Sequence, residues 1–238
     1  MTPESPYPNN IKTPLTVALN PSSAESTSFI SGCPRETLGS LPRSARRTWD
    51  LDSLLHTIRS ATSHVYLSVM DYQPSSLYSS DTVSGNTVWW KDLNDALLEV
   101  QYAKNVSVHM LISNWEHSKP IQFELLKMLK GQGTACGSKC GKFEVKVYEV
   151  PGWNQTDTDE KHGVYPPYSR VAHGKFIVSD KRANIGTSNM AWSYFYSTAG
   201  SSFNTDDEGV VEDLSAAFLR DWYSDYAFDL DAWMERGN

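Results

Sequence analysis

The chain has 238 residues, of which 39% are hydrophobic and 12% aromatic, enough to bury the core of one large domain or two small ones. Its 21 basic and 28 acidic residues give a net charge of −7, which excludes a generally basic surface for nucleic acid but not a local basic cleft. No window approaches eighteen apolar residues, so the sequence predicts no segment that spans a membrane.

Residues 1–47 are rich in Pro, Ser and Thr and close with the basic cluster RSARR, so we expect a tail or linker there. This stretch lacks a basic region followed by an apolar one and does not resemble a signal peptide. Two explanations stay open: the protein is cytosolic, or a preceding part that carried its targeting signal is missing from this chain.

From Trp49 onward, helical and strand patterns alternate, which predicts a layered α/β sheet in a single domain over residues 48–238. Helices are expected from Asp50 and over residues 88–105, 121–131 and 213–227. Strands are expected over residues 64–72, 106–112, 143–150, 170–180 and 182–186, with the last two joined at Lys181. No internal repeat is visible.

Each predicted helix has an apolar face at helical spacing. The second helix should bury Trp89, Leu93, Ala96, Leu97 and Val100, and the last should bury Leu214, Ala217, Phe218 and Trp222. The third should end at Gly131, because glycine is common just past a helix C-terminus.

Three cysteines and two sequons give weak signals about the compartment. Cys136 and Cys140 bracket a short loop and form a candidate disulfide, with free thiols as the alternative. Cys33 is left over and is expected to pair outside this chain, if at all. Asn105 and Asn154 begin Asn-x-Ser/Thr sequons and are candidate glycosylation sites.

The segment RVAHGKFIVSDKRANIGTSN, residues 170–189, places several polar groups on a predicted strand, turn and strand. Strand alternation points His173 and Lys175 to the same face, and the turn brings Asn189 round after Asp180. Phosphodiester transfer needs a nucleophile, a proton donor and neutralised phosphate oxygens. Imidazole supplies the first or second near neutral pH, while ammonium and amide groups supply the third. A lone His-x-Lys is usually just a surface strand; the combined spacing is what favours a site.

The segment resembles the HKD motif of the phospholipase D superfamily, and especially the second half of the lysosomal phospholipase D3 and D4 group. Further stretches are similar in the same order, so the resemblance covers roughly residues 49–230. They are DLDSLLHTIRSATSHVYLSVMDYQP, LISNWEHSKP, VKVYEVP and FLRDWYSDYAFDL.

This resemblance implies a phospholipase D fold in which two HKD motifs meet. One histidine attacks phosphorus to form a phosphohistidine, the other protonates the leaving oxygen, and no metal is required. By position, His173, Lys175 and Asn189 match the catalytic groups, and Asp180 matches the motif acid, expected to give structural support. Met190 stands where close members often have tryptophan.

Only one complete HKD motif is visible, although His117-x-Lys119 precedes Glu124 at the motif spacing. No Gly-x-x-Asn turn follows, so we interpret His117 as a loop residue at a strand end, near the pocket at best. The second motif would come from a second copy of the chain in a C2 dimer or from a longer parent protein, of which this chain is the C-terminal half. The second explanation is favoured.

The resemblance implies a 5′ exonuclease on single-stranded DNA or RNA in an acidic, lysosomal lumen. The motif fits equally a phospholipase D or transphosphatidylase acting on phospholipids, and a catalytically silent half-domain is the third alternative. Tyr168 and Trp192 are candidate pocket residues because aromatic rings stack on bases, although packing explains such aromatics as well.

Overall fold

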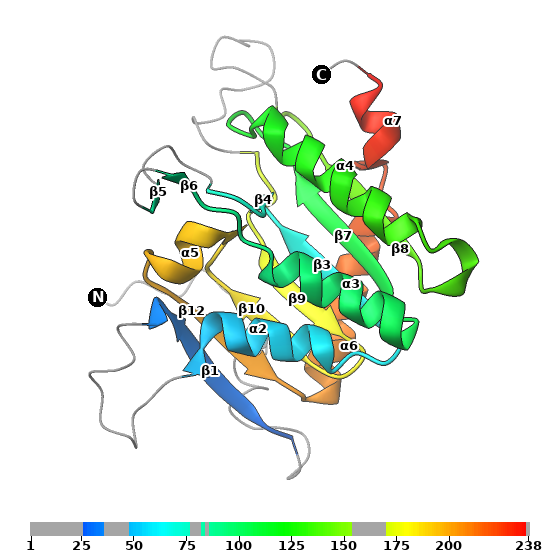
Figure 1. Cartoon of the computed structure of the whole chain (residues 1–238). Coiled ribbons are helices and arrows are strands. Elements are labelled where there is room, and N and C mark those ends of the chain that lie inside the picture. Colours follow the sequence, from blue (N-terminus) through cyan, green and yellow to red (C-terminus); the bar gives the residue numbers. More distant parts are fainter. Residues whose placement is uncertain (1–25, 36–47, 77–81, 84–85, 154–169, 237–238) are drawn as a thin grey trace, which may run out of the picture.

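A mixed β-sheet forms the centre of the molecule (Figure 1). The computed structural model describes residues 26–35, 48–76, 82–83, 86–153 and 170–236. In this part of the chain the main sheet has nine strands in the order β13-β8-β7-β3-β9-β10-β12-β1-β2. These strands are β1 (Ser28–Cys33), β2 (Thr48–Trp49), β3 (His64–Val69), β7 (Ser107–Ser113), β8 (Phe143–Tyr148), β9 (Lys175–Ser179), β10 (Ala183–Gly186), β12 (Gly200–Thr205) and β13 (Ala227–Asp229). Two small sheets pair β4 (Tyr72–Gln73) with β11 (Met190–Ala191) and β5 (Thr82–Val83) with β6 (Asn86–Thr87).

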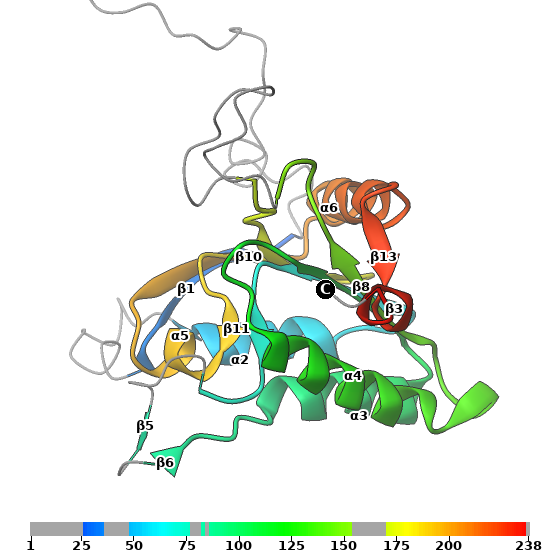
Figure 2. The ribbon, with the colours of Figure 1, turned by 90° about the horizontal axis from the view of Figure 1, so that it is seen from above.

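Helices cover both faces of the main sheet (Figure 2). One face carries α2 (Asp50–Arg59), α3 (Asp92–Lys104) and α4 (Pro120–Thr134), and the other carries α6 (Glu208–Trp222). The short helices α5 (Trp192–Tyr196) and α7 (Leu230–Met234) lie at the margins. None of the helices in the described ranges has the length and hydropathy needed to cross a bilayer.

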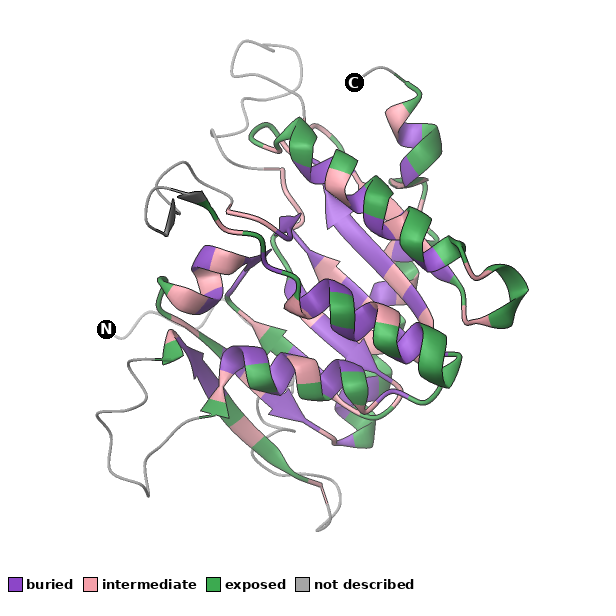
Figure 3. Cartoon of the chain, in the orientation of Figure 1, coloured by how far each residue is buried: buried purple, intermediate pink, exposed green. Residues whose placement is uncertain are grey.

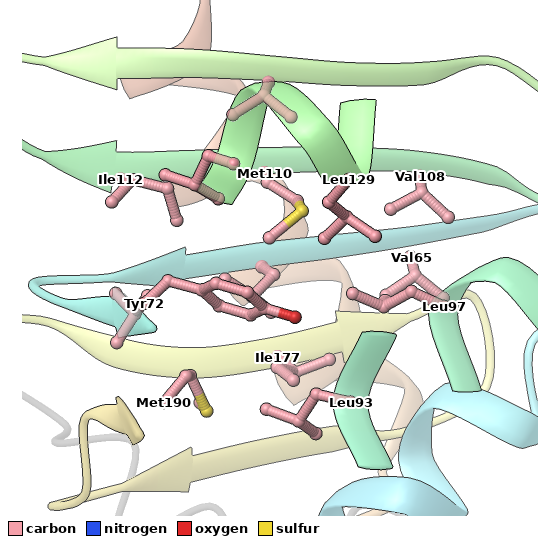
Figure 4. Close-up of a cluster of buried hydrophobic side chains, with 14 of the residues drawn as sticks. Val65, Tyr72, Leu93, Leu97, Val108, Met110, Ile112, Leu129, Ile177 and Met190 are labelled. Carbon is pink, nitrogen blue, oxygen red and sulfur yellow. The ribbon is translucent and has the colours of Figure 1, made fainter. Parts of the chain in front are cut away.

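The core follows from the apolar patterns of the central strands. β3, β7 and β8 run parallel; every second residue of β3 and β8 is buried, and the last four residues of β7 are all buried (Figure 3). The larger cluster fills the space under α2, α3 and α4, where Val65, Leu97, Met110 and Ile177 are fully buried (Figure 4). Smaller clusters under α6 contain Phe218 and Val178, among others.

Two strand pairings bring separate parts of the chain to one edge of the sheet. β3 and β9 are antiparallel, with Val69 opposite Lys175. Continuing this register by two residues places Asp71 level with His173. β4 and β11 are parallel, with Tyr72 opposite Met190, so Asp71 also lies beside Asn189. The two pairings therefore place Asp71 next to both His173 and Asn189.

The prediction that residues 1–47 form a tail or linker is wrong for Ser28–Cys33. This segment is strand β1, which pairs antiparallel with β12 and places Ile30 opposite Phe203. Ser31 is fully buried and donates a hydrogen bond of 2.7 Å to Asp50. The serine-rich composition hid the strand because its hydroxyl groups are satisfied only by distant residues.

Several predicted boundaries moved because local packing decided them. α3 begins at Asp92, and Trp89 is 57% exposed while the neighbouring Trp90 is buried. α4 continues past Gly131 to Thr134, and α6 begins at Glu208, where Asp207 caps it by accepting from Val210 N. Helix α6 buries Phe218 and Trp222 as expected, while Leu214 and Ala217 are half-buried.

The cysteines and sequons have the following places. Cys136 and Cys140 are joined by a disulfide around the 3₁₀ turn Gly137–Lys139. Cys33 is a buried free thiol that donates to Tyr194 O at 3.1 Å, rather than a group exposed for an external partner. Asn105 is exposed at the left-handed C-cap of α3, and Asn154 lies outside the described residues.

Candidate active site

His173 and Lys175 lie where β9 begins, beside the end of β3. His173 is exposed and precedes the strand, instead of being part of it as the sequence pattern predicted. Lys175 is the first residue of β9, is only 7% exposed and donates from Nζ to His173 O at 3.0 Å. Ser113, at the end of β7, donates from Oγ to Ala172 O at 2.8 Å. These contacts hold the imidazole at the sheet edge.

Asn189 is also at this edge, but it is 1% exposed. Its Nδ2 donates to Asp71 Oδ2 at 2.9 Å and to the Tyr194 hydroxyl at 3.2 Å. Its Oδ1 accepts from Asp71 N at 3.4 Å. Both amide hydrogens are therefore used within the protein, which differs from the expectation that they face a phosphate.

Asp71 links the other groups and is the site residue that the sequence analysis missed. It is 6% exposed, and its second carboxylate oxygen accepts from Trp115 Nε1 at 3.3 Å. A carboxylate is rarely this buried without partners. An acidic residue directly after the apolar strand HVYLSVM was the available signal, because such a position is expected to be apolar unless the acid has a specific role.

The charges of the site affect one another. Burial raises the pKa of Asp71, and the hydrogen bond from Trp115 and the nearby positive charge of Lys175 oppose that rise. Burial also lowers the pKa of Lys175 to about 8, with Asp71 pulling it upward. Partial burial and the charge of Lys175 lower the pKa of His173 below 6.5, against the attraction of Asp71. The imidazole is therefore mainly neutral near pH 7, beside a mainly charged ammonium.

Asp180 lies just past the other end of β9, away from the imidazole. Its carboxylate accepts from Thr62 N at 2.9 Å, from Ser63 N at 3.1 Å and from the Thr62 hydroxyl. Although burial raises it, these hydrogen bonds bring the pKa of Asp180 below 3.8. This location agrees with the structural supporting role that we expected for the motif acid.

The remaining predicted site residues are not all brought together. His117 lies in the loop between β7 and α4, as expected, and its ring stands edge-on to Trp115 with centroids 4.7 Å apart. Trp192 stacks on Tyr196 in α5 at 5.4 Å and packs against the core. Tyr168 lies outside the described residues.

The arrangement supplies the groups for attack on, or proton transfer to, a phosphodiester. It combines a neutral imidazole at the surface, a buried ammonium two residues further along the chain and a buried carboxylate that is hydrogen-bonded to Asn189. Among the described residues, no cluster of three or more His, Cys, Asp or Glu could hold a metal ion.

Comparison with protein families places the chain clearly. The family described as "PLD3/4, PLD-like domain" matches residues 7–153. The virion nicking-joining enzyme of vaccinia virus (strain Western Reserve) is 37% identical over 230 residues, covering 94% of this chain and 48% of that protein. The 5′-3′ exonuclease PLD3 of Xenopus laevis is 36% identical over 242 residues, covering 96% and 44%. The chain thus spans about half the length of these curated relatives.

Solved structures show the same fold. NucT from Helicobacter pylori superposes with a TM-score of 0.54 at 14% identity, covering 86% of this chain and 99% of NucT. Nuc from Salmonella typhimurium, a phospholipase D family member, gives 0.52 at 11% identity, covering 86% and 98%. The family match and the shared fold lead to one conclusion: the chain belongs to the phospholipase D superfamily and, within it, to the PLD3/4 group of PLD-like domains.

Proposed function

We propose that this chain provides one half of a metal-independent phosphodiesterase site whose preferred substrate is single-stranded DNA or RNA, degraded from the 5′ end. The observation that carries the proposal is the pairing of an exposed, mainly neutral His173 with the buried ammonium of Lys175 at a single sheet edge. A neutral imidazole can attack phosphorus, and a fixed positive charge stabilises the negative charge that develops.

The reaction has two steps. An imidazole nitrogen forms a bond to phosphorus as the bond from phosphorus to the leaving oxygen breaks, and a second imidazole gives that oxygen a proton. Water then attacks phosphorus, the nitrogen–phosphorus bond breaks and the second imidazole takes the proton from water. His173 performs one of these two roles, and the histidine of a second HKD half performs the other.

Lys175, Asp71 and Asn189 have separate roles in this proposal. Lys175 neutralises the non-bridging phosphate oxygens. Asp71 stabilises the imidazolium form of His173, because its negative charge acts to raise the pKa of that ring against the larger lowering effects of burial and Lys175. Asn189 holds the Asp71 carboxylate in place through the 2.9 Å hydrogen bond.

The activities named for two relatives support a nucleic-acid substrate. PLD3 of Xenopus laevis is a 5′-3′ exonuclease, and the vaccinia relative is a nicking-joining enzyme. We also propose the acidic endomembrane lumen as the place of action, because a lowered pKa keeps part of His173 neutral in mildly acidic solution.

The second HKD half comes from a second copy of the chain or from a longer parent protein. Light scattering after size-exclusion chromatography distinguishes these. A dimer whose specific activity rises with concentration supports a shared site between two copies. A monomer without turnover supports a half-domain that is silent when separate.

Phospholipid transfer is the second candidate, because phospholipase D Y of Dictyostelium discoideum is 33% identical over 184 residues, covering 77% of this chain and 37% of that protein. The test assays one preparation on 5′-labelled single-stranded oligonucleotide and on phosphatidylcholine vesicles, at pH 5 and pH 7. Removal of nucleotides from the labelled end supports the first proposal. Release of choline without oligonucleotide cleavage contradicts it and supports the second.

A further inference from the structure

A cavity of about 280 Å³ lies beside the His173 site. It opens between the loop that follows β7, the first turn of α4 and helix α7. Its volume is close to the lower end of the range for small-ligand sites, about 300 Å³. Four aromatic and four polar residues line it together with a proline and a methionine: Asn114, Trp115, Glu116, Ser118, Pro120, Phe123, Glu124, Trp153, Trp233 and Met234.

The cavity wall is fixed by buried hydrogen bonds. Trp233 donates from Nε1 to Glu149 Oε1 at 2.6 Å, and the same oxygen accepts from Asn114 Nδ2 at 2.9 Å. The rings of Phe123 and Trp233 pack with centroids 4.4 Å apart. Because these side chains are already positioned, a ligand enters a preformed site and orders few groups on binding.

Trp115 links the cavity to the active site. Its ring lines the cavity, while its Nε1 donates to Asp71 Oδ1 at 3.3 Å. Asp71 in turn is bound to Asn189 and acts electrostatically on His173. Trp115 is therefore shared between the cavity lining and the hydrogen-bonded Asp71–Asn189 pair.

Charge is separated between the two places. Positive charge is at Lys175, whereas the charged residues in the described cavity lining are Glu116 and Glu124. A phosphate is attracted to Lys175 and repelled from the cavity. A flat, uncharged group with amino hydrogens suits the cavity, because indole rings stack on its face and carboxylates accept hydrogen bonds from its N–H groups.

We infer that the cavity binds the nucleobase of a nucleotide next to the scissile phosphate. This inference rests on the proposed nuclease function. It assigns a binding site to a second part of the substrate, the nucleobase beside the scissile phosphate. Stacking on a tryptophan is tolerant of base identity, since every base has an aromatic face. The cavity therefore contributes affinity for nucleic acid over other diesters more than sequence preference.

Trp153 is the residue on which to test this, because it is half-buried in the lining and, unlike Trp115, does not take part in the hydrogen bonds described for the active site. Binding is measured by fluorescence anisotropy in a His173→Ala background, which removes cleavage, with a labelled single-stranded oligonucleotide and an abasic oligomer of equal length. The variants are Trp153→Ala, Trp153→Phe to restore an aromatic face, and Trp89→Ala as a control at a tryptophan that is 57% exposed outside the lining.

We expect Trp153→Ala to raise the Kd for the oligonucleotide roughly 5- to 100-fold and to leave the abasic oligomer unchanged. Trp153→Phe should restore most of the affinity, and Trp89→Ala should change neither probe. Equal weakening of both probes, or no weakening at all, overturns the base site.

Cleavage by the same variants with His173 intact separates this inference from the proposed function. If Trp153→Ala changes neither base binding nor the cleavage rate at subsaturating substrate, the proposed nuclease function is kept and the base site is rejected. Base-dependent binding without any cleavage, in a preparation that contains both HKD halves, keeps the base site and removes the proposed nuclease function. Preferential binding of phosphocholine over the oligonucleotide contradicts the base site.

Discussion

Asp71 and Asn189 are joined by two hydrogen bonds: Asn189 Nδ2 donates to Asp71 Oδ2 at 2.9 Å, and Asp71 N donates to Asn189 Oδ1 at 3.4 Å. The amide of the motif asparagine is thus committed to a buried carboxylate that lies level with His173 in the strand register. We interpret this pair as the element that partly offsets the effects of burial and of Lys175, both of which lower the pKa of His173.

Replacing Asp71 with asparagine should lower the pKa of His173 further. The substitution removes a negative charge that favours the imidazolium, while burial and Lys175 continue to disfavour it. Histidine NMR titration measures the change directly. His64, whose pKa is lowered by burial and raised by Asp180, should titrate as in the wild type and serves as the internal control. An unchanged His173 titration would show that the carboxylate does not act on this ring.

Replacing Lys175 with methionine should move the pKa of His173 in the opposite direction. Removing the neighbouring positive charge makes the imidazolium less unfavourable, so its pKa rises toward 6.5. Turnover should fall about 10²- to 10³-fold, because a charge aimed at the phosphate oxygens is lost. The thermal midpoint, recorded in parallel, should fall only modestly, since methionine fills the same buried space but cannot make the 3.0 Å hydrogen bond to His173 O. A fall in the His173 pKa would contradict this arrangement.

The pH–rate profile should have an alkaline limb near pH 8. The pKa of Lys175 is lowered to about 8, so the ammonium that the phosphate requires is lost as pH rises through that value. Lys175→Arg keeps a charge at all accessible pH values and should remove the alkaline limb, even if its maximum rate is lower. The profile should be measured as kcat/KM, which reports groups of the free enzyme. An identical limb in the arginine variant would assign it to another group.

Replacing Asp180 with asparagine should destabilise the fold without changing the chemistry. Loss of charged hydrogen bonds to Thr62 and Ser63 should cost about 1–3 kcal/mol of unfolding free energy at pH 7. Because the folded pKa lies below 3.8, this contribution is present above pH 4 and is lost as pH falls through the folded pKa. Urea unfolding at pH 7 and pH 3 should show a smaller difference between variants at the lower pH. A greater difference at pH 3 would contradict the assignment.

The motif could be found in the sequence because its spacing and the strand alternation are local properties. His173, Lys175 and the supporting Asp180 could be assigned from one short segment. Asp71 could not be assigned in the same way. Its importance arises from the pairing of Val69 with Lys175 and of Tyr72 with Met190, which joins segments more than a hundred residues apart.

Contacts between distant segments also explain the errors in the predicted fold. Strand β1 lacks a clear alternation of apolar and polar residues and is paired along its whole length with β12, so its own pattern predicted a linker. Trp89 and Trp90 are adjacent, and only the three-dimensional packing of Trp90 against Phe195, with centroids 5.0 Å apart, determines which one is buried.

The most direct measurement is turnover of a labelled phosphodiester quenched in alkaline denaturant, with mass spectrometry, without acid exposure, of the peptides that carry histidine. The account predicts a base-stable, acid-labile phosphate adduct that still carries one substrate substituent, bound to an imidazole of an HKD motif in the wild type, and its loss or strong slowing in His173→Ala. An adduct that forms and turns over in His173→Ala as in the wild type would contradict the central role of this residue.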